Sequence, residues 1–335
     1  MTRTALHTAD DRPGALPPLP TRLDDPVTGI VHGLFAGRTV ADPLAFGPRS
    51  GRARRWRYVA AGGRDAAVGA AVVHLGAVAV AFAWAQLGAR TVTWERRVPF
   101  GRGVEVDRGL DGSASVRLAG ARLQLDVDGG LRIDVPADDG QRLTALVHPT
   151  GDATPAVGVT GTREGGWNAT QKAAGYPVAG WVRRGSGPRV ELGADGGGWR
   201  DASSGRQDRR TAWHWAAGAG RAGDGRRVGL NASTGWQDEP WEDVVWWDGV
   251  PLQLEVARLR PQDEWEPTGD WVVGGPGWEL WFEPDGVRAK DERLGVITSR
   301  YVQPIGWFRG TLPSPEGRAV EVDLLGVTED HLAVW

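Results

Sequence analysis

A carboxylate and a histidine stand close together near the C-terminus, in the stretch TEDHLAVW at residues 328–335. If this stretch is a β-strand, Glu329 and His331 share one face, because side chains alternate between the two faces of a strand. A carboxylate beside a histidine can fix the tautomer of the imidazole and raise its basicity, as in an oriented general base. The same pair could instead form an ion pair at an exposed edge, or a buried network that fixes the end of the chain.

Another histidine lies between two tryptophans in RTAWHWAAG, residues 210–218. Read as a strand, this stretch places Trp213 and Trp215 on one face and His214 on the other, between small residues. The aromatic face could line a cavity or fill a core. His214 could reach a ligand from its own face, or make a hydrogen bond within a core.

Asp201, in WRDASSG at residues 199–205, is the residue that we expect to be the catalytic acid. Desolvation in a pocket lined by tryptophan would raise the pKa of its carboxyl group and let it donate a proton. The alternative is a turn or capping aspartate. Glu329 and His331 form our second candidate catalytic pair. The residues that we expect to bind the polar groups of a ligand, beside the tryptophans and His214, are Gln171, Lys172, Tyr176, Tyr301, Gln303 and Arg210.

The composition argues against several classes of function. Of 335 residues, 24% are charged and the net charge is −3, so we expect no nucleic-acid binding and no stable membrane insertion. Without cysteine there is no disulfide, thiolate metal site or cysteine nucleophile. The chain has neither a P-loop nor a dinucleotide-binding glycine motif, and its six histidines lack metal-ligand spacing. We therefore expect no cofactor and no metal; histidines that only the fold brings together are the alternative.

Short runs of alternating apolar and polar residues predict an all-β protein of antiparallel barrels or sandwiches. SVRLAG, RLQLDVDGG and LRIDVPA are typical of a meander with Asp-Gly turns. The uncharged run at 66–89 is long enough for a membrane helix, but its second half alternates, which favours two buried strands joined near His74. The segment 149–166 is expected to be a long loop. Fifteen of the eighteen tryptophans follow residue 160, and we expect most to be structural and a few to line a ligand site.

The first twenty residues, MTRTALHTADDRPGALPPLP, are polar and rich in proline. They lack the apolar core of a signal peptide. We interpret residues 1–25 as a flexible arm and expect the protein to be cytoplasmic.

Several motifs occur together in a recognisable order: TQKAAGYPVAGWV (170–182), DASSG (201–205), YVQPIGWFRG (301–310) and GVTEDHLAVW (326–335). In this combination the chain resembles, over residues 28–335, a bacterial family of unknown function that is common in actinobacteria and ends in E-x-H-x-x-x-W. More distantly, it is similar to the lipocalin-like superfamily of carotenoid hydratases, tocopherol cyclases and fungal pericyclases.

This resemblance implies two lipocalin-like β domains packed together, a ligand pocket between or within them, and no metal or organic cofactor. After the arm, it implies a first domain at residues 26–235 and a second at residues 236–335. In the distant relatives, a W-x-D-H-x-W-G segment carries an aspartate that is thought to protonate an alkene. Asp201 has that position here, while Ala202 replaces the histidine and the second tryptophan is absent.

Two classes of function remain open. One is a cofactor-independent cyclase, isomerase or hydratase that acts on a hydrophobic, unsaturated small molecule; the other is a lipocalin-like carrier of a lipid or polyene. A buried acid facing the cavity favours the enzyme, and a cavity lined only by apolar and neutral groups favours the carrier. In either class we expect a monomer or homodimer. We expect Asp201, the 210–218 tryptophans and the Glu329/His331 pair to meet in one cavity near the junction of the two domains.

Overall fold

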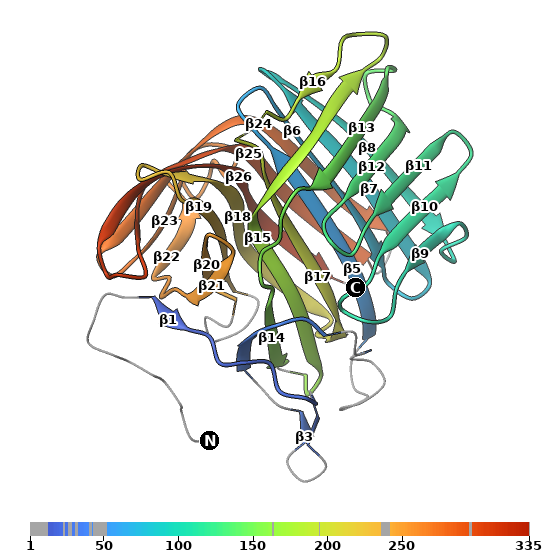
Figure 1. The fold of residues 1–335 in the computed structure, drawn as a ribbon. Helices are drawn as coiled ribbons and strands as arrows, with labels where there is room; N and C mark the ends of the chain where they lie inside the picture. Colours follow the sequence, from blue (N-terminus) through green and yellow to red (C-terminus); the bar gives the residue numbers. More distant parts are fainter. Residues whose placement is uncertain are drawn as a thin grey trace.

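The computed structural model describes residues 13–22, 24–25, 29–30, 33–39, 42, 52–162, 164–193, 195–235, 242–294 and 297–334. Regular secondary structure in these residues consists of β-strands, and the strands form two large curled sheets that pack together (Figure 1). Neighbouring strands within each sheet run antiparallel. The predicted all-β, antiparallel fold is therefore confirmed.

The first sheet contains fourteen strands in the order β8-β7-β6-β5-β17-β15-β13-β12-β11-β10-β9, with β14 and β16 paired to β15 and β4 paired to β14. Most neighbours in this order are also neighbours in the chain, as in a meander. The bounds are β4 Gly33–Ala36, β5 Arg52–Gly62, β6 Ala66–His74, β7 Val78–Leu87, β8 Arg90–Pro99, β9 Val104–Val106, β10 Ala114–Leu118, β11 Ala121–Leu125, β12 Leu131–Pro136, β13 Arg142–Pro149, β14 Ala156–Gly161, β15 Trp167–Arg184, β16 Val190–Glu191 and β17 Gly197–Gln207.

The second sheet contains ten strands in the order β1-β21-β20-β19-β18-β26-β25-β24-β23-β22. Its three longest strands, β24 to β26, are consecutive in the chain and form a meander. The bounds are β1 Gly14–Ala15, β18 Arg210–Ala222, β19 Arg227–Thr234, β20 Val244–Trp247, β21 Val250–Gln253, β22 Arg258–Pro261, β23 Trp271–Gly275, β24 Trp278–Leu294, β25 Ile297–Pro313 and β26 Ala319–Val334; β2 Asp24–Asp25 and β3 Gly29–Ile30 form a separate pair.

The uncharged run at 66–89 forms β6 and β7, two paired strands joined at residues 75–77, as its alternation predicted. Strands β9 to β12 fold back over β6, so that β6 is buried over most of its length. Small residues suit a strand that is covered in this way, because bulky side chains would hold the layers apart. Within the described residues, no helix is long and apolar enough to span a membrane.

The prediction of a long loop at 149–166 was wrong, because β14 lies within this segment. β14 pairs with β15 on one side and with β4 on the other. Val157 and Val159 are fully buried and pack with Trp167 in a small hydrophobic cluster. The alternating valines were the available signal, but the surrounding glycine, threonine and proline residues obscured it.

The chain passes from one sheet to the other between β17, which ends at Gln207, and β18, which begins at Arg210. β18 and β19 both belong to the second sheet, so the sheets divide the chain earlier than residue 235. The division into domains at 26–235 and 236–335 stays a prediction. Of the proposed arm, residues 1–12 lie outside the described residues, while Gly14 and Ala15 pair with β21.

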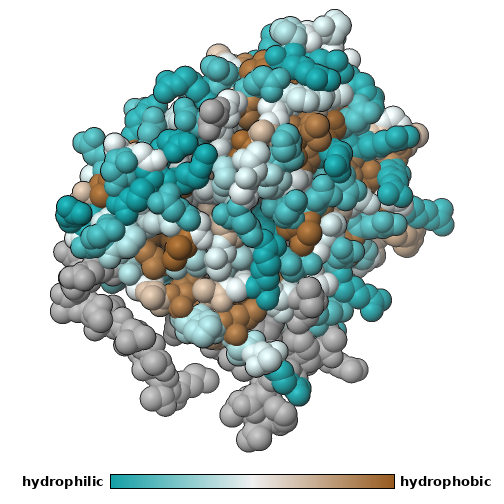
Figure 2. Space-filling view, viewed as in Figure 1, coloured by the Kyte–Doolittle hydropathy of each residue, from teal (hydrophilic) through white to brown (hydrophobic). Residues whose placement is uncertain are grey.

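The two sheets pack through β15, which lies against β18, β19 and β20. One hydrophobic cluster contains residues of both sheets, including Trp199 and Trp215. The backbones touch where Gly175 of β15 meets Gly229 of β19: a Cβ atom on Gly229 would lie 2.3 Å from the carbonyl carbon of Ala174. Gly175 has a φ of 80° at a bulge of β15. Outside this core, the face shown in Figure 2 is mostly hydrophilic, with apolar residues in separate patches.

We predict that Gly229→Ala lowers the free energy of unfolding by about 2–3 kcal/mol, since the added methyl group must separate two tightly packed backbones. Urea unfolding followed by tryptophan fluorescence measures this loss. Gly223→Ala, in the turn after β18, is the matched control, because a Cβ atom there would meet its nearest neighbour at 3.8 Å, an ordinary contact. Equal stability of the two variants would contradict the proposed backbone contact.

Candidate functional site

A cavity of about 280 Å³ lies between the two sheets. Strands β6 and β7 of the first sheet and the turn between them supply an apolar wall, and β5 and β18 supply aromatic side chains. Charged and polar side chains of β8, β15, β17, β19, β24, β25 and β26, together with Glu242 before β20, form the rest. The apolar wall consists of Ala71, Val73, Leu75, Val78, Val80 and Phe82, and the aromatic residues beside it are Trp56, Tyr58, Trp213 and Trp215.

The cavity brings together most of the residues that the sequence singled out. They come from both sheets and from positions up to 159 residues apart in the chain, from Lys172 to His331. Strand alternation explains this selection, since each of the residues lies on the inward face of its strand. The residues in question are Lys172, Asp201, Trp213, Trp215, Tyr301, Gln303, Glu329 and His331.

His214 and Arg210 lie outside the cavity. His214 faces away from Trp213, and its Nδ1 lies 3.0 Å from the carbonyl oxygen of Leu259. Its ring also meets Trp271 edge-on, with the ring centroids 5.3 Å apart. Arg210 is exposed at the start of β18. His214 therefore makes contacts within the second sheet, as the alternative reading of its strand allowed.

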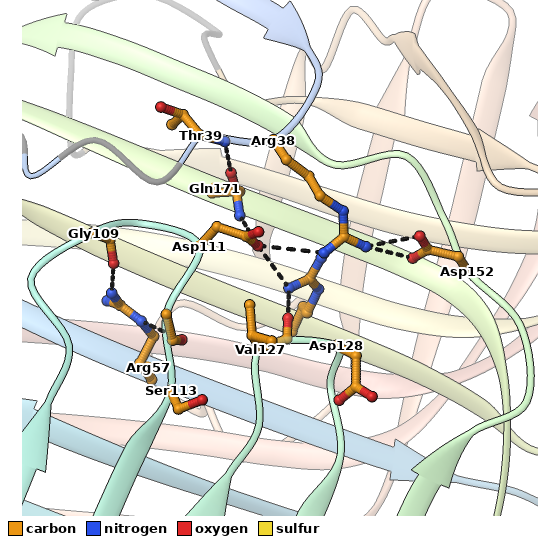
Figure 3. Close-up of polar contacts among 12 residues, drawn as sticks. Arg38, Thr39, Arg57, Gly109, Asp111, Ser113, Val127, Asp128, Asp152 and Gln171 are labelled. Atoms are coloured by element: carbon orange, nitrogen blue, oxygen red, sulfur yellow. Dashed lines mark hydrogen bonds and ion pairs between the residues drawn. The ribbon is translucent and has the colours of Figure 1, made fainter.

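Gln171 and Tyr176 also lie outside the cavity. Gln171 points to the opposite face of β15 from Lys172, where its Nε2 donates to Asp111 at 2.8 Å and its Oε1 accepts from the amide of Thr39 at 2.9 Å (Figure 3). Arg38 joins Asp111 to Asp152 in the same polar network. This network links the segment before β5 to the first sheet. Tyr176 is fully buried.

Glu329 and His331 form a hydrogen-bonded pair on β26. His331 Nδ1 lies 3.1 Å from Glu329 Oε1, and the His331 ring stacks on Trp213 with the centroids 4.1 Å apart. Glu329 also accepts hydrogen bonds from Trp213 Nε1 at 3.0 Å and from Gln303 Nε2 at 2.6 Å. Burial alone would raise the pKa of Glu329, but the hydrogen bond and positive charge of His331, the charge of Arg288 and the Trp213 hydrogen bond hold this pKa below its usual value.

This arrangement determines how His331 can exchange protons. Because Glu329 is held as a carboxylate, the neutral imidazole keeps its proton on Nδ1, and Nε2 is left as the acceptor. Nε2 lies 3.1 Å from Ser299 Oγ, at the wall of the cavity. His331 is therefore an oriented base with its lone pair directed toward the cavity wall.

Asp201 belongs to a second group of charges, which centres on Lys172. Lys172 Nζ lies 3.0 Å from Asp201 Oδ1 and 3.4 Å from Glu242 Oε2. Asp201 Oδ2 accepts a hydrogen bond from Trp56 Nε1 at 3.0 Å. Burial alone would lower the pKa of Lys172, but the two carboxylates raise it above its usual value. Both oxygens of Asp201 thus contact donors.

A third group of charges surrounds Glu95 of β8. Its carboxylate contacts Arg288 Nη2 at 3.2 Å, Lys290 Nζ at 2.5 Å and the hydroxyl of Tyr301 at 2.9 Å. Burial alone would raise the pKa of Glu95, but these donors lower it. The guanidinium carbon of Arg288 lies 3.5 Å from the centroid of the Phe82 ring. Arg288 therefore connects the charged wall of the cavity to the apolar wall.

Four charged residues of these groups were not predicted from the sequence: Glu95, Glu242, Arg288 and Lys290. A signal existed in β24, where Arg288, Lys290 and Glu292 occupy alternate positions and therefore share one face. Such a charged face would normally be read as exposed to solvent. Among the described residues, no group of three or more histidine, aspartate or glutamate side chains is arranged to hold a metal ion.

We predict that Lys172→Met destabilises the protein by about 3–5 kcal/mol near neutral pH, because it leaves two buried carboxylates without their cation. Urea unfolding at about pH 7 and about pH 5 tests this. In the wild type, the pKa of Lys172 is raised in the folded state. The stabilisation that this gives is fully present below the unfolded-state pKa of lysine, and it is lost only as the pH rises through the folded-state pKa. In the variant, protonation of the unpaired carboxylates favours folding at low pH, so its deficit shrinks toward pH 5.

Lys290→Met is the matched control for this prediction. Lys290 is 39% exposed, and Glu95 keeps Arg288 and Tyr301 as partners when Lys290 is removed. We expect its loss to cost less than about 1 kcal/mol. A larger cost for Lys290→Met than for Lys172→Met would contradict the role assigned to the buried group.

Three solved structures are similar to this one to different degrees. An AttH-type protein of Nitrosomonas europaea matches with a TM-score of 0.52 and 13% sequence identity, covering 93% of this chain and 98% of that one. Kievitone hydratase from Nectria haematococca matches with a TM-score of 0.49 and 13% identity, covering 95% and 97%. CghA with Sch210972 matches with a TM-score of 0.45 and 13% identity, also covering 95% and 97%.

No curated protein has a matching sequence. The likeness to the AttH-type protein supports the fold of two curled β-sheets, which it shares over nearly its full length. One family model matches residues 38–335, which include all the residues lining the cavity. The chain belongs to the family that this model describes, the domain of unknown function DUF2804.

Proposed function

We propose that the protein is a cofactor-independent enzyme that transfers a proton to or from a compact, largely apolar and unsaturated small molecule. The reaction is an isomerisation, cyclisation or hydration that starts with this proton transfer. His331 exchanges the proton, Glu329 orients His331, and the apolar and aromatic walls hold the substrate in a reactive conformation.

The observation that carries the proposal is the oriented His331 in the wall of a largely apolar cavity. A carrier of an apolar compound needs no base, whereas the Glu329–His331 hydrogen bond of 3.1 Å prepares one. Trp213 supports the pair twice, by stacking on the imidazole ring and by donating its Nε1 hydrogen to Glu329. The faces of Trp213 and Tyr301 can also stabilise positive charge that develops on a protonated substrate.

The size of the cavity limits the substrate. About 280 Å³ is close to the lower end of the roughly 300–1,000 Å³ that small-molecule sites occupy. This volume favours a compact ring system or a short unsaturated chain over a full-length polyene. The apolar wall of β6 and β7 would contact the hydrocarbon part, and the opposite wall would contact its polar group.

Asp201 is the other residue that we considered as the acid. Its two oxygens accept contacts from Lys172 and Trp56, so proton donation by Asp201 requires both contacts to rearrange. His331 requires no such change, because Nε2 needs only to exchange its contact with Ser299. For this reason we assign proton transfer to His331, and to Asp201 the holding of Lys172 at the cavity wall.

The test begins with native mass spectrometry of the protein purified from the organism that encodes it, which identifies any small molecule bound in the cavity. The identified compound is then incubated with the protein in D₂O. We expect a product that carries deuterium on carbon. Recovery of the unchanged compound without deuterium would overturn the proposal and leave a carrier function.

With that compound as substrate, we predict that His331→Gln lowers kcat by roughly 100- to 10,000-fold, the usual contribution of a general acid or base. Binding, measured by quenching of tryptophan fluorescence, should change little, since glutamine keeps a polar group of similar length. Asp201→Asn serves as the comparison, and we expect it to keep kcat within about tenfold of the wild type. The opposite ranking of the two variants would assign the proton transfer to Asp201.

A further inference from the structure

We propose that Ser299 is a nucleophile, activated by His331 and Glu329, and that the cavity therefore also supports acyl transfer from compact apolar esters. This activity goes beyond the proton transfer proposed above. It uses a covalent intermediate on Ser299, a residue that proton transfer does not require.

Three side chains form a continuous relay from Ser299 to Glu329. Ser299 Oγ lies 3.1 Å from His331 Nε2, and His331 Nδ1 lies 3.1 Å from Glu329 Oε1. With the Nδ1 proton directed to the carboxylate, Nε2 accepts the hydroxyl proton of Ser299. A nucleophile, a base in contact with it and a third group that orients the base are the three parts of a serine relay, which recurs on unrelated folds.

The strand register explains why these three residues meet. Ser299 lies on β25 and the other two on β26, where Tyr301 is directly opposite His331 and Ser299 opposite Ala333. His331 therefore reaches Ser299 diagonally across the two strands, on the face that lines the cavity. Glu329 is fixed from both sides by Trp213 and Gln303, so the relay is held by side chains of three strands.

A cluster of ion pairs lies next to Ser299 in the sheet. Glu292 lies directly opposite Ser299 in the register of β24 and β25. Both Arg97 and Lys290 form ion pairs with Glu292. Arg97, Glu292 and Ser299 all line the cavity. To stabilise the negative charge that develops on the carbonyl oxygen of an ester, one of these cations would exchange its contact with Glu292 for the oxyanion.

The acyl transfer balances without any further reactant except water. Ser299 Oγ attacks the ester carbonyl carbon while its proton passes to His331 Nε2. The tetrahedral intermediate collapses, the carbon–oxygen bond to the alcohol breaks, and His331 returns the proton to the leaving alkoxide. Water then attacks the acyl group, giving a proton to His331, and the free acid leaves as Ser299 recovers its proton.

An alkyl fluorophosphonate tests the nucleophile directly, because Ser299 would displace fluoride and retain the phosphonyl group. We expect one adduct per chain in the intact mass, and peptide mapping should locate it at Ser299. Ser299→Ala should give no adduct, and His331→Asn should react at least about 100-fold more slowly. Hydrolysis of p-nitrophenyl butyrate should decline in the same order.

Ser115→Ala is the control. Ser115 also contacts a carboxylate, Glu105 Oε2 at 3.4 Å, but within the described part of the chain it has no histidine partner, and it does not line the cavity. It should react with the fluorophosphonate at the wild-type rate. Absence of an adduct from folded protein, an adduct on another serine, or an unchanged rate in Ser299→Ala would each overturn the proposal. Deuterium incorporation by the wild-type protein in D₂O is measured separately, so that a missing adduct would overturn the acyl transfer while incorporated deuterium would still support the proton transfer.

Discussion

Five carboxylates lie in the wall of a cavity between two β-sheets, and each must be compensated by a cation or by donated hydrogen bonds; they are Glu95, Asp201, Glu242, Glu292 and Glu329. An uncompensated buried charge costs several kcal/mol, which is a large part of the total free energy of unfolding of a domain. The compensation crosses from one sheet to the other. Glu95 of the first sheet binds Arg288 and Lys290 of the second, while Lys172 of the first sheet binds Glu242, which follows the second sheet's β19. The same ion pairs that satisfy these charges therefore hold the two walls in position.

Glu329 is compensated differently from the other four carboxylates. In the part of the chain that the structure describes, its direct partners are Trp213, Gln303 and His331, and no lysine or arginine contacts it. A lysine or arginine partner stays charged near neutral pH, whereas histidine can change its charge there. The hydrogen bond between His331 Nδ1 and Glu329 Oε1 also holds the imidazole with Nε2 beside Ser299 at the cavity wall. This makes the pair suited to chemistry, while the other carboxylates serve to hold the cavity together.

Strand alternation made a large part of the fold and of the cavity predictable. The Ala/Val run at 66–89 could be read as two strands. Glu329 could be placed on one strand face with His331, and Trp213 on one face with Trp215, because each of these predictions depends only on neighbouring residues. The partners of these residues could not be predicted in this way. Glu95 meets Lys290, which is 195 positions away in the chain, and only the curvature and register of the two sheets bring them together. A local pattern also cannot say which face of a strand points inward, so Gln171 and His214 were included along with their neighbours Lys172 and Trp213.

The passage between the sheets explains why so much of the site is concentrated in one stretch of sequence. β17 ends at Gln207 in the first sheet and β18 begins at Arg210 in the second, yet both strands have side chains in the cavity. Asp201 and Trp213 thus approach one cavity from opposite sheets although they are close in the chain. Because the connection between β17 and β18 is short, β18 can move only a short distance relative to β17. The segment from Trp199 to Trp215 therefore sets the spacing of the two walls as well as their chemistry. A change in the length of the connection would shift Asp201 relative to Trp213, whereas Trp213 and His331 lie directly opposite each other in the register of β18 and β26 and would stay together.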